Sequence, residues 1–512
     1  MDVNDRGGFR AAQRRASELI DAGDASGAIA FVDGLVAGVG HERNVRILRA
    51  VTRTHTASLH KNVPLLRETV SLWRALDPGD HADIAFNLAN AQLAVLELTV
   101  QASRGWVAAW DSVREYLHEA RAAFERIGRS ATSPLELRLK SWTNAGNTYD
   151  IVGRDLEAIE CYGKALALDG NFAMALGNRG SALFQVAKLM GSHRPTVLNQ
   201  ARVDLDAALA HGDSVRANGV ESSLADFQSL RDRFPAGPPP PPRVRPPHRW
   251  PDPYLRWADQ NELFLHVSHA CLAPETRILD PLLLKSVTAD SSLISIPQLL
   301  DAFNACKQDY LTARYVTWLA FEQASPLISH AQSLSGRASF ADSGTGAQWD
   351  AFAGLAVQAF AATANVLDKV ANYLHLYIGS RRTRLYFKTI ASPAAQRGHP
   401  KPALYPELGL CLDAPEWNRG VMALVDLSHE LQRDTTLSRF LGMRHAATHR
   451  FMVVHIASAP ASDRWIVRSR WDDLRSETLA LLRAVRAALV YLARAVGVHE
   501  ARGPQSTLVP ET

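Results

Sequence analysis

A proline-rich segment near the middle of the chain constrains the fold more than any other feature. Ten of the 19 residues from Pro235 to Pro253 are proline. Proline fixes φ and lacks a backbone N–H, so this segment can form neither a helix interior nor a central strand. It is typical of a stiff polyproline-II spacer, and we expect a linker at residues 235–253 with a domain on each side. Docking of an SH3-like partner on this segment is the alternative interpretation.

The composition indicates a soluble globular protein. The chain has 512 residues, of which 47% are hydrophobic and 21% charged, enough for roughly two or three domains. No run of uncharged apolar residues is as long as the about 18 residues that a membrane-spanning helix needs. The N-terminus lacks the basic-then-apolar order of a secretory signal. The four cysteines are widely spaced and include no CxxC pair. This pattern argues against a disulfide scaffold and against a structural zinc site. We therefore expect a cytoplasmic protein with no membrane partner.

The sequence before the linker is helical and repetitive. Between Trp142 and Gly170, aromatic and small residues follow the order and spacing of the tetratricopeptide (TPR) repeat. Gly146 and Ala158 would let two antiparallel helices approach closely, while aromatic side chains such as Tyr162 fill the space between them. Weaker copies of the pattern elsewhere predict a TPR-like solenoid whose concave groove binds a protein or peptide. A purely structural helical array is the alternative.

The sequence after the linker stays helical but loses the repeat. Apolar residues recur at intervals of three and four over residues 347–378, 418–432 and 471–496, which predicts amphipathic helices. Residues 383–390 could be a strand or a loop, and no parallel-sheet pattern is present. We therefore predict an all-α fold, a TPR-like helical solenoid followed by an antiparallel helical bundle.

Several common catalytic motifs are missing. Neither GxxxxGK[ST] nor GxGxxG opens a helix, and the chain contains no GxSxG or HExxH sequence. His445 and His449 could present two imidazoles to one metal from one face of a helix. The glutamate that would act as general base is missing and no third ligand is obvious, so we expect no metal and no cofactor.

The same segment contains an Arg-x4-His pair, Arg444 and His449. Arginine supplies fixed positive charge for a phosphate, and histidine can transfer a proton near neutral pH. Together they could cleave RNA without a metal, with the ribose 2′-hydroxyl attacking the adjacent phosphate. Three other pairs share this spacing: Arg243 and His248, Arg450 and His455, and Arg494 and His499. Spacing alone therefore does not choose among them.

Several blocks after the linker carry a resemblance to one family. They are Tyr254–Trp257, Asn261–Leu265, Phe303–Tyr310, Ala313–Tyr315, Asp368–Leu374, Arg444–Arg450 and Arg486–Leu492. In this order they cover about residues 254–496 and resemble the LA2681-like HEPN family, whose members carry TPR-like repeats before a HEPN domain. The resemblance implies a helical HEPN-type bundle, usually dimeric, and in many cases a metal-independent endoribonuclease with an Arg-x4–6-His motif.

The resemblance also implies roles for individual residues. Arg444 would contact the scissile phosphate, and His449 would act in proton transfer. His445 occupies the position directly after the arginine, where the family usually has asparagine. Arg450 and Arg439 could contact the RNA backbone. Two copies of the motif would meet across a homodimer interface in the HEPN domain.

The resulting hypothesis is a ribonuclease that leaves 2′,3′-cyclic phosphate ends and is regulated by the repeat array. Family analogy suggests a toxin of a toxin–antitoxin pair or an antiviral defence effector. The alternative is a non-catalytic dimeric scaffold, in which the repeats bind a protein and the HEPN domain only dimerises or binds nucleotide. The expected boundaries are a TPR-like array at 1–234, the linker at 235–253, a family-specific helical segment at 254–335, the HEPN domain at 336–500 and a flexible tail at 501–512.

Overall fold

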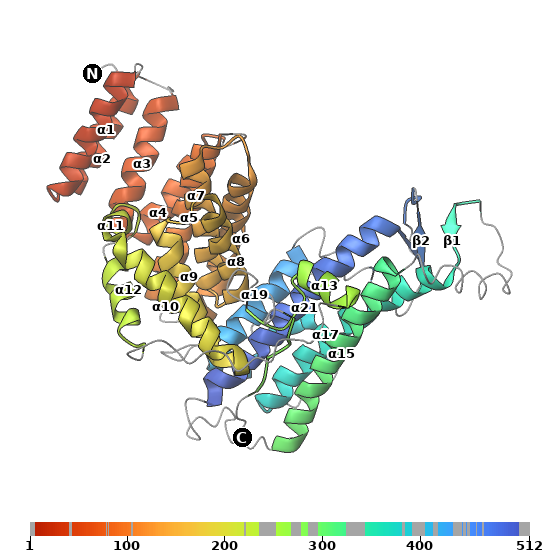
Figure 1. The fold of residues 1–512 in the computed structure, drawn as a ribbon. Coiled ribbons are helices and arrows are strands. Elements are labelled where there is room, and N and C mark those ends of the chain that lie inside the picture. The colour runs from red at the N-terminus through yellow and green to blue at the C-terminus, as the bar shows by residue number, and fades with distance from the viewer. Residues whose placement is uncertain are drawn as a thin grey trace. The chain divides into compact units, whose positions relative to one another are not determined.

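The protein is predominantly α-helical in the computed structural model (Figure 1). The structure describes residues 6–39, 43–77, 79, 81–103, 106–219, 222–234, 252–267, 278–284, 295–323, 344–380, 385–391, 405–412, 418–433, 443, 447, 451–456, 458–462 and 465–500. The chain divides into two compact units. One comprises Met1–Ile151, Glu160–Asn178 and Ala207–Leu224, and the other comprises Val152–Ile159, Arg179–Asp206 and Ala225–Thr512. Residues 235–251 and the tail 501–512 lie outside the described residues, so the predicted domain boundaries stay a prediction.

The first unit is an array of helices that follow one another in space as they do in sequence. Its helices are α1 (Arg6–Asp21), α2 (Ala25–Val39), α3 (Arg43–Leu59), α4 (Val63–Arg74), α5 (Ala82–Ala102), α6 (Trp106–Arg129), α7 (Leu135–Asp150), most of α8 (Asp155–Leu168), the start of α9 (Ala173–Val186) and α11 (Gly212–Asn218). Each helix from α1 to α6 packs against the next one along the chain. Packing between sequence neighbours is the mark of a solenoid, and the predicted TPR-like array is confirmed.

The best repeat predicted from the sequence folds as expected. Gly146 on α7 faces the ring of Tyr162 on α8, and a Cβ atom at this glycine would lie 2.3 Å from Cε1 of the tyrosine. The Tyr162 hydroxyl donates a hydrogen bond to Oδ1 of Asn147 at 2.9 Å. Because Gly146 has no side chain, the Tyr162 ring can pack directly against α7 and hold the two helices in contact.

The second unit contains a bundle of four long helices, α15 (Ile296–Glu322), α17 (Ala351–Tyr377), α19 (Arg419–Arg433) and α21 (Trp471–Glu500). Helix α21 packs against the other three, and α15 also packs along α17. Shorter elements complete the unit: η1 (Ala187–Leu189), η2 (Gly191–His193), α10 (Arg194–Ala210), α12 (Ser223–Arg231), α13 (Pro253–Gln260), η4 (Phe387–Thr389) and α18 (Pro406–Leu412). The helical bundle predicted after the linker is confirmed.

Helix α17 is the most apolar element of the bundle. It is the one described helix that is long and apolar enough to cross a membrane by length and composition. Half of its most apolar 18-residue stretch is buried inside the protein. Residues such as Phe360, Val366 and Leu374 fill the centre of the bundle. The apolar character of α17 is therefore explained by its place in the core of the bundle.

Helices α19 and α21 cross closely where α19 begins. The side chain of Asn418 caps α19, because its Oδ1 accepts hydrogen bonds from the backbone N–H groups of Gly420 and Val421, each at 3.1 Å. Its Nδ2 donates to the Ala495 carbonyl on α21 at 2.8 Å. A Cβ atom at Gly420 would lie 2.3 Å from the backbone nitrogen of Ala495. One asparagine and one glycine thus fix the start of α19 on α21.

A small sheet joins the ends of the bundle helices. It consists of β1 (Ala347–Gln348), β2 (Phe451–His455) and β3 (Ile466–Arg470) in the order β1-β2-β3. Strand β1 pairs antiparallel with β2, and β2 pairs parallel with β3. The expectation that the chain has no parallel pairing is wrong. Buried parallel strands usually read as continuous apolar runs, whereas β3 carries two arginines in five residues.

Two predicted elements also differ from the structure in detail. The helix predicted from residue 347 begins at Ala351, because β1 takes the first two residues and Asp350 caps the helix by accepting a hydrogen bond from the Ala353 N–H at 2.8 Å. Residues 383–390, left open between strand and loop, contain the 3-10 turn η4 at Phe387–Thr389.

Candidate functional site

The predicted catalytic motif falls on a segment that the structure describes only in part. The predicted site residues Arg439, Arg444, His445, His449 and Arg450 lie outside the described residues, so their roles stay predictions. Met443 and Ala447, which flank Arg444, are described and helical, and Met443 is buried. The surroundings of the motif are therefore defined by the elements on either side of it, α19 before and β2 after.

Strand β2 begins two residues after His449. Its first residue, Phe451, is 67% exposed, whereas Val453, Val454 and His455 are buried. The strand thus runs from the surface into the protein while it pairs with β1 on one side and β3 on the other. Strand β2 is consequently tied by backbone pairing to the residues that precede α17 and α21.

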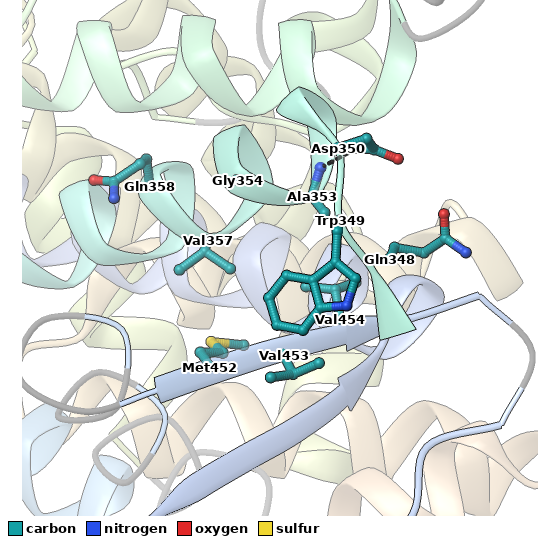
Figure 2. Close-up of a pocket in the computed structure, with 10 residues that line it drawn as sticks. All are labelled: Gln348, Trp349, Asp350, Ala353, Gly354, Val357, Gln358, Met452, Val453 and Val454. Atoms are coloured by element: carbon teal, nitrogen blue, oxygen red, sulfur yellow. Dashed lines mark hydrogen bonds between the residues drawn. The ribbon is translucent and has the colours of Figure 1, made fainter. Parts of the chain in front are cut away.

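A pocket of about 220 Å³ opens between β1, β2 and the first turns of α17 (Figure 2). It is lined by Gln348, Trp349, Asp350, Ala353, Gly354, Val357, Gln358, Met452, Val453 and Val454. The indole of Trp349 stands over β2 and forms one wall, and it is 44% exposed (Figure 2). Gln348 and Gln358 lie at opposite ends of the lining, and their side chains extend away from the Trp349 indole (Figure 2). The site therefore combines an aromatic wall, an apolar floor and two groups that both donate and accept hydrogen bonds.

Two features of α17 keep the pocket open. Gly354 lies on its lining, and a Cβ atom at this residue would meet nothing within 4 Å. Asp350 uses its carboxylate to cap the helix, which positions the backbone at the start of α17. The sequence analysis missed this pocket because its lining comes from segments about 100 residues apart that only the sheet brings together.

The chain next to the pocket is strongly basic. From residue 435 to residue 470 the sequence contains six arginines and a single acidic residue, Asp463. Two of the arginines are described on β3. The Arg468 guanidinium donates to the Ala461 carbonyl at 3.1 Å, and Arg470 lies 3.9 Å from the carboxylate of Asp472. Such an exposed ion pair is weak, so Arg470 remains available to a stronger anion such as phosphate.

Two of the competing Arg-x4-His pairs contain residues with packing roles. His455 is fully buried, and neither of its ring nitrogens has a hydrogen-bond partner. Arg494 forms an ion pair with Asp155, and His499 packs edge-on against the ring of Tyr377 with centroids 5.3 Å apart. Arg243 and His248 lie in the linker, outside the described residues. Packing thus accounts for the described members of these pairs, and the roles of Arg444 and His449 stay predictions.

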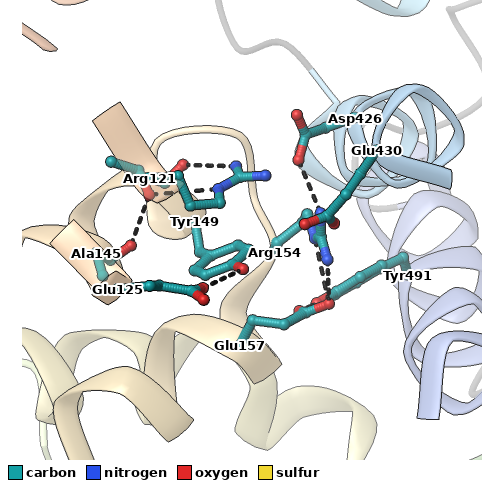
Figure 3. Close-up of polar contacts among 10 residues, drawn as sticks. Arg121, Glu125, Ala145, Tyr149, Arg154, Glu157, Asp426, Glu430 and Tyr491 are labelled. Carbon is teal, nitrogen blue, oxygen red and sulfur yellow. Dashed lines mark hydrogen bonds and ion pairs between the residues drawn. The ribbon is translucent and has the colours of Figure 1, made fainter. Parts of the chain in front are cut away.

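A buried ion-pair cluster holds α19, the helix that precedes the motif (Figure 3). The guanidinium of Arg154 donates to the carboxylate of Asp426 at 3.0 Å, also contacts that of Glu430, and donates to Glu157 at 2.6 Å. The Tyr491 hydroxyl on α21 contacts the carboxylate of Glu157 (Figure 3). Asp426 is fully buried, so its charge depends on this cation.

A second buried carboxylate lies beside this cluster. Asp155 is fully buried and pairs with Arg494 of α21, while the Arg419 guanidinium at the start of α19 lies 3.7 Å away. Together the two clusters join the N-terminal end of α8 to both α19 and α21 within one unit. The sequence analysis did not find them, because each joins residues more than 260 positions apart.

Two arginines in the blocks that carried the family resemblance have structural roles. The buried guanidinium of Arg314 binds the Asp280 carboxylate at 2.9 Å and the Leu263 carbonyl at 2.9 Å. Arg486 donates from Nε to the Phe264 carbonyl at 2.7 Å. These contacts fasten the segment after α13 onto α15 and α21. Both side chains are fully engaged inside the protein, and this excludes them as RNA contacts.

The described residues contain no group of three or more His, Cys, Asp or Glu side chains that could hold a metal ion. Burial raises the pKa of the Cys306 thiol to about 11. That thiol is consequently protonated near neutral pH and is not a nucleophile.

Comparison with protein families identifies the bundle. Residues 291–499 match the model of the LA2681-like HEPN family. The predicted family resemblance is confirmed, and the matched HEPN region contains the Arg444–Arg450 motif, both pocket strands and the four bundle helices. The earlier blocks at residues 254–265 lie before the match. No curated protein matches the chain.

Two solved structures are similar to part of the chain. One is the crystal structure of the MamA protein, with 14% identity and a TM-score of 0.25, covering 41% of this chain and 94% of that one. The other is the TPR2AB-domain:pHSP90 complex of yeast Sti1, with 14% identity and a TM-score of 0.17, covering 44% of this chain and 97% of that one. Scores this low add nothing to the packing described above, on which the repeat array rests.

Proposed function

We propose that this protein is a metal-independent endoribonuclease of the HEPN type. The observation that carries the proposal is the family match over residues 291–499, a range that includes the Arg-x4-His motif and the basic segment of the sequence. Arg444 neutralises charge on the scissile phosphate, and His449 transfers the proton during attack by the ribose 2′-hydroxyl. His445, directly after Arg444, is the third catalytic candidate, and Arg439 and Arg450 contact the backbone of the RNA.

The products of this reaction follow from its chemistry. The 2′-oxygen attacks the adjacent phosphorus as His449 accepts its proton, and the bond to the 5′-oxygen of the next nucleotide breaks as that oxygen gains a proton. The strand therefore ends in a 2′,3′-cyclic phosphate, and the other fragment begins with a 5′-hydroxyl. The histidine of the second subunit in a homodimer supplies the second proton-transfer group.

The repeat array regulates this activity in the proposal. A protein or peptide bound to the TPR-like helices would alter the HEPN region, as expected of a cytoplasmic toxin neutralised by an antitoxin or of an antiviral defence effector. This cellular role rests on family analogy.

The test uses the purified full-length chain with RNA in the presence of EDTA. Wild-type protein should release fragments with 2′,3′-cyclic phosphate ends, and His449→Ala should abolish the release. Arg444→Lys keeps the charge but loses the bidentate fork, so it should reduce the rate less than Arg444→Ala does. His60→Ala, at an exposed turn after α3, is the matched control and should cleave as wild type does.

The same experiment separates the competing functions. Cleavage that EDTA abolishes would replace the metal-independent mechanism with the histidine–metal alternative. Absence of cleavage by wild type, both alone and with proteins that bind the repeats, would favour the dimeric scaffold.

A further inference from the structure

We propose that the pocket between β1, β2 and α17 binds one unpaired nucleobase of the RNA substrate, beside the phosphate that is cut. The inference rests on the proposed ribonuclease function for the identity of the polymer. It adds a binding site built from Trp349, Gln348, Gln358 and Gly354, none of which belongs to the Arg-x4-His motif.

The size of the pocket fits one base. An apolar cavity of about 150 Å³ is sufficient to bind benzene. The pocket of about 220 Å³ therefore has room for a larger planar heterocycle. A base in a duplex is covered by its neighbours and its partner, so only an unpaired base could enter.

The chemistry of the lining fits the two faces and the edge of a base. Trp349 offers an indole plane on which a base can stack, and Val357 and Met452 provide apolar contacts. Stacking of a base on an aromatic side chain tolerates every base, because every base has a π face. The amides of Gln348 and Gln358 lie at the two ends of the lining, where they can donate to and accept from polar groups of a nucleotide at the rim of the pocket.

The place of the pocket in the chain connects it to the motif. Met452 lines the pocket and follows His449 by three residues, and three residues of extended chain span at most about 11 Å. An RNA strand held by its phosphate at His449 is thus close enough to deliver a neighbouring base to the pocket.

The charge of the surrounding chain favours a polyanion as the occupant. Six arginines against one acid between residues 435 and 470 would hold the phosphates on either side of the bound base. The charge balance therefore favours a nucleic acid as the occupant of the pocket.

The test measures binding separately from cleavage. All proteins carry His449→Ala in the full-length chain, so that a fluorescein-labelled single-stranded RNA remains intact, and the dissociation constant is measured by fluorescence anisotropy. Gly354→Phe should fill the pocket, because Gly354 belongs to the lining and a Cβ atom there meets nothing within 4 Å. Trp349→Ala removes the indole on which the base would stack. Gly163→Phe on α8 is the matched control, since a Cβ atom there also meets nothing within 4 Å.

Both pocket variants should weaken single-strand binding by about tenfold, which is the fold-change of a stacking contribution of about 1.4 kcal/mol. The control should bind as the parent protein does. One abasic nucleotide placed at successive positions of the RNA should weaken binding to the parent at a single position, and Gly354→Phe should be insensitive to it.

Three results would overturn the inference. They are unchanged affinity of both pocket variants, an equal loss of affinity for single-stranded and duplex RNA, and a change in oligomeric mass without a change in RNA binding. A failure of the proposed catalysis is distinguishable from these. If wild-type protein never cleaves RNA but the pocket variants still lose affinity for it, the pocket stands and the ribonuclease mechanism falls.

Discussion

The ion pairs of Arg154 lead to a quantitative prediction about α19. The Arg154 side chain is only 4% exposed and neutralises Asp426, whose side chain is 0% exposed. Substitution Arg154→Met removes the charge but keeps most of the aliphatic volume. The Asp426 carboxylate would then be buried without a cation, beside two further carboxylates that had shared the same partner.

The magnitude follows from the burial of the pair. Breaking a buried ion pair by removing one partner costs about 3–5 kcal/mol, chiefly because the other charge stays buried and uncompensated. Each 1.4 kcal/mol is a factor of ten, so the opening equilibrium of α19 should rise at least about a hundredfold. Adding Asp426→Asn removes the stranded charge, and the double variant should recover a large part of the loss.

Hydrogen exchange of the full-length protein, followed by mass spectrometry of peptides from residues 419–433, measures this opening directly. Arg216→Met is the control, because Arg216 and its partner Asp213 form an exposed pair, and it should leave α19 unchanged. Exchange of α19 at the wild-type rate in Arg154→Met would refute the reasoning, as would a double variant that exchanges as fast as the single one.

Three further predictions concern single positions. Gly153→Ala should lower the Tm, because φ at this position is 80° and the new Cβ would lie 2.4 Å from the Arg419 carbonyl oxygen. Gly34→Ala should raise the Tm, because this glycine lies inside α2 with nothing within 4 Å of a Cβ atom and alanine favours the helix. Cys306, with its pKa raised by burial to about 11, should resist iodoacetamide in the native protein at about pH 8 and react after unfolding, as measured by mass spectrometry. Burial lowers the pKa of His193 in the folded protein. The contribution of the neutral imidazole to folding stability is therefore present above about pH 6.5 and is lost as the pH falls through the folded-state pKa. His193→Leu should therefore lose less Tm on acidification than wild type, and an equal loss would contradict this assignment.

The sequence predicted the helices because their information is local. The contact between Gly146 and Tyr162 lies within one repeat, and the spacing of small and aromatic residues identifies it. The helix predicted at 418–432 is observed at Arg419–Arg433, and the one predicted at 471–496 at Trp471–Glu500. A 3.6-residue apolar period is visible in any single helix of this length, so no knowledge of its partners is needed.

The sequence analysis failed where the determining contact joins distant segments. Strand β1 is two residues long and pairs with β2 about 100 positions later, so no local alternation marks it. The dependence of Asp426 on Arg154 is similarly hidden, because a charged residue on a helix normally indicates an exposed face. The pocket depends on the pairing of β1 with β2, and it could not be predicted before that pairing was known.

The sheet also connects the pocket to the bundle. Gln348 of β1 pairs with Val454 of β2, and β1 leads within three residues into α17. Strand β3 pairs along the other side of β2 and continues without a break into α21 at Trp471. Because β2 follows the motif directly, a displacement of the chain after His449 must break these ladder hydrogen bonds or move the starts of both helices. A base bound against β2 as proposed would stabilise this arrangement of strands and helices, and we expect RNA binding at the pocket and the position of His449 to be energetically coupled.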